Sequence, residues 1–193
     1  MLTFYFAPGS SSMAPHIALH EVGASFESRP LSFHRKETRE PAYLALNPEG
    51  KVPTLLIDGR PLTEVAAILF YLARTFPDAN LLPPDDIEAQ AQVISWMSFI
   101  AATVHPARRQ GVARCNEVFT IAEGRLGSRS RAVGPYSIAD IHLFRLFWRF
   151  VGSFPTDAAR FPALTAHYHR MMARPAVQRT CEIEAGIGYE MPA

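Results

Sequence analysis

The stretch that decides the fold spans residues 47–68 and reads NPEGKVPTLLIDGRPLTEVAAI. Its middle part, residues 52–57, is apolar enough for a buried strand, and an Asp-Gly turn joins it to the second arm of a hairpin. Proline lacks the backbone donor that a central strand needs, so Pro53 predicts a cis peptide bond that turns the backbone of Val52 toward a ligand. A strand that begins only after Pro53 is the simpler alternative, and the sequence leaves both open.

Short strand-like runs alternate with helical patterns on both sides of this stretch. We expect strands at residues 2–6, 26–31, 52–57 and 60–63, and helices at 13–22, 38–46 and 64–74. This order of elements is typical of a small α/β sheet domain. The domain would cover residues 1–77, and a linker rich in Pro and Asp would follow it.

The chain changes character after Pro84, where no convincing strand is found. The spacing of apolar residues predicts helices at 87–104, 113–126, 137–151, 162–173 and 175–184. Pro106, directly after His105, should kink or end the first of these helices. The sequence therefore predicts an all-α domain over residues 85–193, with a poorly ordered tail from Gly186.

Composition and charge exclude several classes of protein. Of the 193 residues, 48% are hydrophobic and 19% are charged, which disfavours intrinsic disorder. The net charge of +1 argues against a dedicated nucleic-acid binder. The longest apolar run, residues 65–73, is shorter than the about 20 residues that cross a bilayer, and the N-terminus looks like a strand rather than a signal peptide. Neither cysteine belongs to a Cys-x-x-Cys pair, so we expect a soluble cytoplasmic protein without a disulfide framework or a metal site.

Residues 8–12, which read PGSSS, lie between the first strand and the first helix. Small hydroxyl residues at a helix start commonly cap its free N–H groups, and these serines could do only that. The same position also suits an anion such as a thiolate, because a helix N-terminus carries partial positive charge and spare donors.

Glu64 begins the helix that follows the hairpin. A glutamate there is favourable for the helix dipole whatever the function. It could also hold the ammonium group of a ligand, while the neighbouring N–H groups hold a carboxylate.

Together, in this order and spacing, the three patterns resemble the glutathione transferase family, nearest its bacterial beta class. The resemblance covers nearly the whole chain. Ser137 and Asp140 match the family's Ser/Thr-x-x-Asp capping box, whose role is folding of the helical domain. The resemblance implies a thioredoxin-like α/β N-terminal domain with Pro53 as the cis-proline, an all-α C-terminal domain and a homodimer.

The resemblance also implies a glutathione site along the first domain. The backbone of Val52 would pair with the cysteinyl part of the peptide, Glu64 would bind the γ-glutamyl ammonium, and the Val65 N–H would bind the γ-glutamyl carboxylate. The family commonly has Ser or Gly at the position of Val65, so one side-chain bond could be missing. Arg35 or Lys36 could reach the glycyl carboxylate, although either could be only a solvated charge. Lys51 and Pro53 complete the expected binding set.

The departure from the beta class lies at the catalytic turn, where Ser11 stands in place of its cysteine. A mixed disulfide with glutathione is therefore impossible there, but the Ser11 hydroxyl could donate to the glutathione sulfur. Ser10 is the second choice for this role. His105 matches a histidine that contacts the site near the sulfur, unless it makes only ordinary interface hydrogen bonds. The candidates for the electrophile site are Met13, Thr103 and Arg109, and Arg109 could equally be a surface charge.

The function expected from this resemblance is attack of a glutathione thiolate on a small hydrophobic electrophile, as in detoxification. A non-catalytic binding or interaction module with the same fold is the alternative. It is favoured by the missing cysteine, by Val65 and by a segment over residues 109–134 that is shorter than usual in the family. A redox enzyme is a third hypothesis, and it would need Cys115 or Cys181 near the site.

Overall fold

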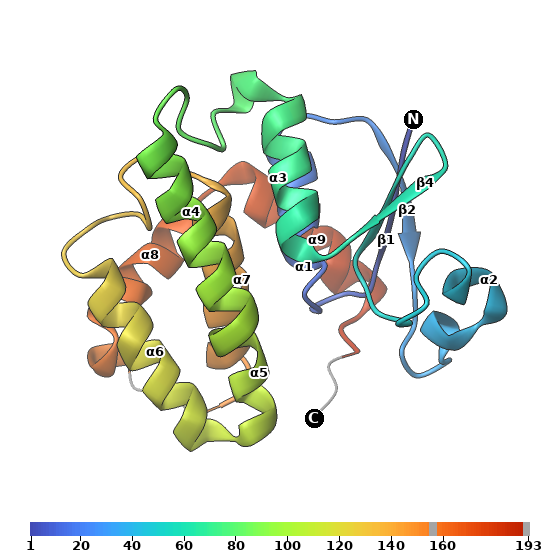
Figure 1. Cartoon of the computed structure of the whole chain (residues 1–193). Coiled ribbons are helices and arrows are strands. Elements are labelled where there is room, and N and C mark those ends of the chain that lie inside the picture. The colour runs from blue at the N-terminus through green and yellow to red at the C-terminus, as the bar shows by residue number, and fades with distance from the viewer. Residues whose placement is uncertain (155–157, 191–193) are drawn as a thin grey trace. The chain divides into compact units, whose positions relative to one another are not determined.

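The computed structural model describes residues 1–154 and 158–190 (Figure 1). The chain divides into two compact units. The first contains Met1–Thr75 together with the chain from Pro175 onward, and the second contains Phe76–Arg174. Each unit is described by itself.

The first unit is built on a four-stranded mixed sheet with the order β2-β1-β3-β4. Its strands are β1 (Leu2–Phe6), β2 (Phe26–Pro30), β3 (Thr54–Ile57) and β4 (Arg60–Thr63). Strand β1 pairs in parallel with β2 and antiparallel with β3, and β3 forms the expected hairpin with β4. The Val52-Pro53 peptide bond is cis, as predicted, and β3 begins directly after it. The cis bond and the start of the strand after Pro53 therefore occur together, while the contact of Val52 with a ligand stays a prediction.

Helices α1 (Met13–Glu21), α3 (Val65–Thr75) and α9 (Pro175–Ile187) lie on one side of the sheet, and α2 (Pro41–Leu44) lies on the other (Figure 1). Residues two apart in a strand point to the same face, so Phe4 and Phe6 stack on each other and both contact His16 of α1. All three side chains are buried. This packing fixes the start of α1 relative to the end of β1.

The helix predicted over residues 38–46 is instead a short 3-10 turn, η1 (Glu37–Arg39), followed by α2. Pro41 explains the break. The residue before a proline is pushed out of the helical region, and Glu40 is extended, with φ −67° and ψ 142°.

Helices and loops make up the described residues of the second unit, and no strand is found among them. Its main helices are α4 (Ile87–Phe99), α6 (Val112–Leu126), α7 (Ile138–Val151) and α8 (Pro162–Met172), with short 3-10 turns η2 (Pro77–Ala79) and η5 (Ala158–Arg160). Helix α7 is buried along almost its whole length. Phe147 and Phe150 of α7 form an aromatic cluster with Phe119 of α6 and with Phe161.

The helix expected over residues 87–104 leaves the α form at Phe99. A π-helical turn, η3 (Ile100–Val104), follows, and then α5 (His105–Ala107) and the 3-10 turn η4 (Arg108–Gln110). Pro106 cannot donate to the preceding turn and its ring crowds that turn, so the predicted disturbance takes the form of a widened turn.

Helix α9 belongs by its contacts to the sheet unit, although the sequence-based division placed residues 175–193 with the helical part. It packs along α1, where Glu184 contacts His16, and Val177, Thr180 and Glu184 are all buried. The tail expected to be disordered from Gly186 is ordered up to Glu190. Helix α9 continues to Ile187, and Tyr189 Oη donates to Cys181 O at 3.2 Å. Residues 191–193 of that tail lie outside the described residues.

Candidate functional site

The opening turn of α1 folds back on the end of β1 through its serine hydroxyls. Ser12 is fully buried, and its Oγ donates to Ala7 O and accepts from Ala7 N, both at 3.1 Å. Ser10 Oγ lies 2.6 Å from Ser12 Oγ. Ser12 is the N-cap residue of α1, yet its side chain makes no capping bond to the helix. The hydroxyl groups of Ser10 and Ser12 therefore shape the turn rather than cap α1.

Ser11 differs from its two neighbours because its hydroxyl reaches out of the turn. It is partly exposed, and its Oγ donates to Val52 O at 3.1 Å. Val52 is the residue before the cis-proline. The structure thus brings together two of the three sequence patterns, the serine turn and the Val52-Pro53 segment, in one contact.

The segment that carries Val52 is held from the side of α2. Lys51 O accepts from Tyr43 Oη at 2.6 Å and from Asn47 Nδ2 at 2.7 Å. Tyr43 Oη also lies 2.9 Å from Thr54 Oγ1, and burial raises the pKa of the Tyr43 phenol. These bonds fix the backbone on both sides of the cis peptide, so the carbonyl that faces Ser11 has a defined position.

Glu64 adopts a positive φ of +71° directly before α3. This conformation is uncommon for a residue with a side chain and often marks a functional site. Glu64 is exposed, its carbonyl accepts from Ile68 N at 3.0 Å, and Val65 is buried beside it. The carboxylate is therefore exposed to solvent at the start of a helix, and its contact with an ammonium group stays a prediction.

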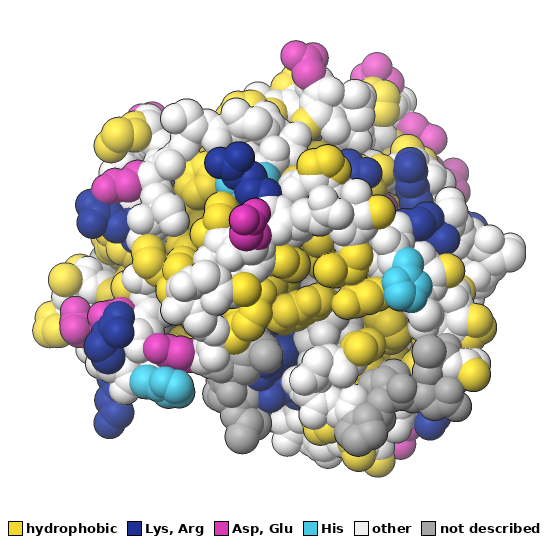
Figure 2. All heavy atoms as spheres, turned by 180° about the vertical axis from the view of Figure 1, so that it is seen from behind, with side chains coloured by type: hydrophobic (Ala, Val, Ile, Leu, Met, Phe, Trp, Pro, Cys, Tyr) yellow, Lys and Arg dark blue, Asp and Glu magenta, His cyan; other side chains and the backbone are white. Residues whose placement is uncertain are grey.

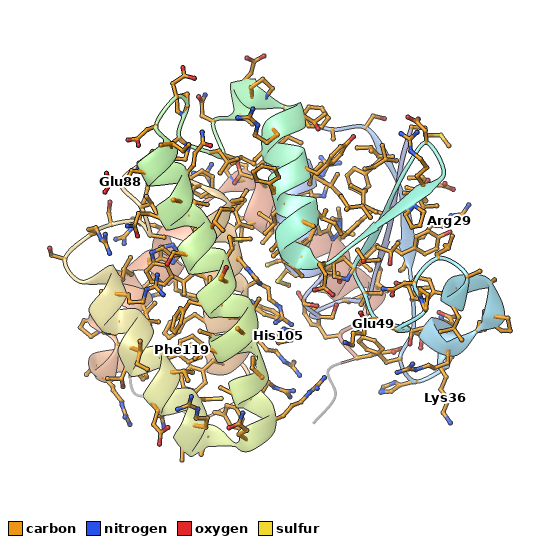
Figure 3. All side chains as sticks on the ribbon, viewed as in Figure 1. Arg29, Lys36, Glu49, Glu88, His105 and Phe119 are labelled. Atoms are coloured by element: carbon orange, nitrogen blue, oxygen red, sulfur yellow. The ribbon has the colours of Figure 1, made fainter. Side chains whose placement is uncertain are left out.

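The two lysines predicted for glutathione binding lie on the surface of the sheet unit. Lys36 is exposed on the loop before α2 and is labelled in Figure 3. Lys51 is exposed and pairs with Glu49. No contact in the described residues joins either lysine to Ser11, so both roles stay predictions.

Glu190 was missed by the sequence analysis, which expected its segment to be disordered. Its carboxylate accepts from His34 N at 3.0 Å and from Ser32 Oγ at 2.7 Å. These hydrogen bonds lower the pKa of the Glu190 carboxyl. The loop before α2 is therefore tied to the C-terminal segment.

Glu184 was also missed, and it contacts the opening turn itself. Its Oε2 accepts from Gly9 N at 2.7 Å, and its Oε1 lies 2.8 Å from His16 Nδ1. Helical spacing places Glu184 on the same stripe as Val177 and Thr180, so a carboxylate in a buried stripe was a signal that the sequence did contain.

The remaining candidates from the sequence have different exposures. Met13 is fully buried in the first unit. Thr103, His105 and Arg109 lie in the helical unit. Thr103 is half-buried in the π-helical turn, and Arg109 is exposed. His105, labelled in Figure 3, is also exposed. Their roles near an electrophile stay predictions.

Neither cysteine has the properties of a reactive thiol. Burial raises the pKa of Cys181 to about 11, and the neighbouring Glu184 charge adds to this effect. Burial also raises the pKa of Cys115. The attacking species of a cysteine is its thiolate, so both shifts count against a redox enzyme that uses its own cysteines. The sequence had suggested that Cys181 lies in the helical domain, but it lies on α9 in the sheet unit.

Charged side chains of both signs are interspersed on the face shown in Figure 2. Among the described residues, no helix is long and apolar enough to cross a membrane.

Comparisons with known proteins agree with this fold. The family model described as glutathione S-transferase, N-terminal domain, matches residues 1–74. Glutathione S-transferase GstA of Escherichia coli O157:H7 is 29% identical over 205 residues, which cover 95% of this chain and 98% of the relative. A glutathione transferase homologue from Sulfitobacter, solved with bound glutathione, has a TM-score of 0.84 and 32% identity over 95% of this chain and 98% of its own. A sphingomonad glutathione S-transferase complexed with glutathione has a TM-score of 0.83 and 32% identity over the same shares.

Proposed function

Because the chain belongs to the glutathione S-transferase family, we propose that Ser11 activates the thiol of bound glutathione for attack on an electrophile. The chain is a glutathione transferase, and glutathione is its co-substrate. The observation that carries the role of Ser11 is its partly exposed hydroxyl, which stands at the start of α1 and bonds to the carbonyl before the cis-proline.

The energy needed for activation is within reach of this turn. A free cysteine thiol has a pKa of about 8.5, and lowering it to about 6.5 requires about 2.7 kcal/mol of preference for the thiolate. One hydrogen bond to a charged acceptor contributes about 1.5–3 kcal/mol. The N-terminus of α1 adds about 0.3–1 kcal/mol. Together they amount to about 1.8–4 kcal/mol, a range that includes the required free energy without a catalytic cysteine.

The Ser11 hydroxyl has one proton, and in this structure Val52 O accepts it. Rotation about the Cα–Cβ and Cβ–Oγ bonds can redirect that proton to another acceptor. A thiolate is charged, so it competes well with a neutral carbonyl for the bond. Val52 O would at the same time become available to a backbone N–H of the bound peptide.

The rest of the peptide would lie along the same unit. We propose that Val52 and Pro53 hold the cysteinyl part, and that the Glu64 carboxylate and the Val65 N–H hold the γ-glutamyl end. The exposed carboxylate of Glu64 and the helix start beside it support this assignment. Lys36 and Lys51 would hold the glycyl carboxylate through charge attraction.

The electrophile would be a small hydrophobic molecule, and Met13, Thr103, His105 and Arg109 remain the candidates for its binding. We further propose that the protein is a cytoplasmic homodimer with a detoxifying role, and its mass in solution measured by light scattering checks the dimer. Of the two domains proposed from the sequence, residues 1–77 would contribute the peptide site and Met13, and residues 85–193 would contribute the other candidates for the electrophile.

The test compares Ser11→Ala with Ser10→Ala. Thiolate absorbance of bound glutathione, titrated with pH, gives the pKa of the thiol, and a chromogenic conjugation assay gives kcat/KM. Ser11→Ala should raise the thiol pKa by one to about two units and lower kcat/KM about tenfold at neutral pH. Ser10→Ala should change the thiol pKa less, because Ser10 bonds within the turn.

Two outcomes would contradict the proposal. An unchanged thiol pKa in Ser11→Ala rejects Ser11 as the activating group. Glutathione binding without any thiolate in the unmodified protein selects the alternative, a non-catalytic glutathione-binding module.

A further inference from the structure

A buried carboxylate lies against the turn that carries Ser11, and the proposed chemistry does not use it. Glu184 has no exposed surface, and each of its oxygens has a partner, Gly9 N at 2.7 Å and His16 Nδ1 at 2.8 Å. We propose that Glu184 and His16 form a positioning pair that holds the opening turn, and through it the Ser11 hydroxyl, in the geometry required by the glutathione sulfur. This inference rests on the proposed role of Ser11.

The cost of burying Glu184 argues that its position matters. A buried carboxylate is destabilising unless it is paired and fully hydrogen-bonded. Val177 and Thr180 share its face of α9, where an apolar residue would pack against α1 without that cost. A carboxylate offers something that a methyl group does not, namely two acceptors with fixed directions. One is aimed at the backbone of the turn and the other at α1.

The turn is held at two points, one on each side. Ser12 holds Ala7 through two hydrogen bonds, and Glu184 holds Gly9, whose φ of +74° suits a glycine. Ser11 follows Gly9 by two residues and is the part of the turn that reaches Val52. Misplacing a reacting group by about 1 Å can cost about a hundredfold in rate, so the anchor at Gly9 bears directly on the hydroxyl.

His16 satisfies the second oxygen of the buried carboxylate. Its side chain is 1% exposed, and its Nδ1 lies 2.8 Å from Glu184 Oε1. A buried carboxylate with an unpaired oxygen would be destabilising, so this contact allows Glu184 to stay buried beside the turn. The pair therefore supplies a hydrogen bond to Gly9 N while both carboxylate oxygens have a partner.

The experiment measures the thiol pKa of bound glutathione and kcat/KM in Glu184→Leu, Glu184→Gln and Glu184→Asp. Leucine leaves Gly9 N and His16 without their acceptor, so we expect the thiol pKa to rise by about one unit and kcat/KM to fall about tenfold. Glutamine keeps an acceptor oxygen for Gly9 and an amide group for His16, so its activity should stay within about threefold of the unmodified protein. Aspartate keeps the charge but is one carbon shorter, so its loss should be intermediate, and it provides the readout if Glu184→Leu does not fold.

A double-mutant comparison separates positioning from general stability. If Glu184 acts through Ser11, replacing Glu184 by Leu or Asp should hardly change the thiol pKa once Ser11→Ala is present. Glu123 is the matched control, because its carboxylate accepts from Ala163 N at 2.7 Å and Leu164 N at 2.9 Å within the helical unit. Glu123→Leu should lower the free energy of unfolding without changing the thiol pKa.

The results distinguish this inference from the proposed function. Suppose that the unmodified protein forms the thiolate and that the thiol pKa is the same in Glu184→Leu and Glu184→Asp. This result overturns the positioning pair and leaves the role of Ser11 intact. The proposal is also overturned if the Glu184 substitutions shift the thiol pKa equally with and without Ser11→Ala, because Glu184 then has a merely structural role. Absence of any thiolate in the unmodified protein overturns the proposed function and this inference with it.

Discussion

At the scale of single residues, a change from cysteine to serine alters what the turn can do. A cysteine there could form a covalent disulfide with glutathione, whereas the Ser11 hydroxyl can only donate or accept a hydrogen bond. Its partner in this structure, Val52 O, shows that the hydroxyl is already aimed at the segment expected to bind the peptide. The chemistry proposed for the chain follows from this single hydroxyl.

His142 is a second residue whose environment has a measurable consequence. It is almost fully buried on α7, and its Nδ1 has no hydrogen-bond partner among the described residues. Burial, with smaller effects from the charges of Arg145 and His105, lowers the pKa of His142 from 6.5 to about 3. The unfolded chain therefore binds more protons at this position between those two pH values, and folding stability falls as the pH is lowered through that window.

We predict that His142→Leu weakens the acid sensitivity of the fold. Lowering the pH from 7 to 5 should reduce the free energy of unfolding by about 2 kcal/mol through His142. The leucine variant should lack this contribution. Urea unfolding at the two pH values measures the difference. His169→Leu is the control, because His169 is exposed on α8 and should leave the pH dependence nearly as it is. Equal pH dependence of the unmodified protein and His142→Leu would contradict the prediction.

At the scale of elements, the start of α7 shows how one side chain organises a unit. Ser137 and Asp140 form the capping box expected from the sequence. Asp140 is fully buried, and its Oδ2 accepts from Ser137 N at 3.0 Å. Its Oδ1 accepts from Ala132 N at 2.8 Å and lies 3.0 Å from His167 Nε2 of α8. The carboxylate thus joins α7 to the preceding loop and to the next helix, in addition to capping.

Asp140→Ala should therefore cost much more than the loss of an ordinary cap. We expect about 3 kcal/mol, because three buried partners lose their acceptor. Asp86→Ala is the matched control, since Asp86 is an exposed N-cap that accepts from Ala89 N at 2.9 Å, and its loss should cost about 1 kcal/mol. Urea unfolding followed by circular dichroism compares the two. A similar loss of unfolding free energy in both variants would mean that the contacts of Asp140 beyond the cap contribute little to stability.

At the scale of the whole molecule, the last helix does not pack in the unit of the helices that precede it in the sequence. Helix α9 follows α8 in the sequence, but it packs on α1 in the sheet unit. The sheet unit is therefore made of two segments of chain that are far apart in the sequence. Stability of the opening turn then depends on residues at the other end of the protein.

Hydrogen exchange should show this division. In Asp140→Ala, the amides of α7 and α8 should lose protection first, while those of α9 stay protected together with those of α1. Mass spectrometry of peptides from the exchanged protein resolves these helices. Exchange of α9 in step with α8 would contradict the assignment of α9 to the sheet unit.

The sequence by itself determined the class of fold and most of its elements. Alternation and helical spacing are local properties, so the strands of the sheet and the helices from α6 to α8 lie within a few residues of their predicted positions. Pro53 and the Ser137–Asp140 box are equally local, because a missing N–H and a capping pair act within a few residues of the chain.

Only the tertiary structure decided which distant groups meet at the opening turn. The bond from Ser11 to Val52 spans 41 residues, and that from Gly9 to Glu184 spans 175. The pattern of residues around one group does not reveal its distant partner. Such a hydrogen bond depends on how helices and strands pack, and not on the spacing of residues along the chain. The sequence could propose a serine for the chemistry, but the packing of α9 on α1 decides what holds that serine in place.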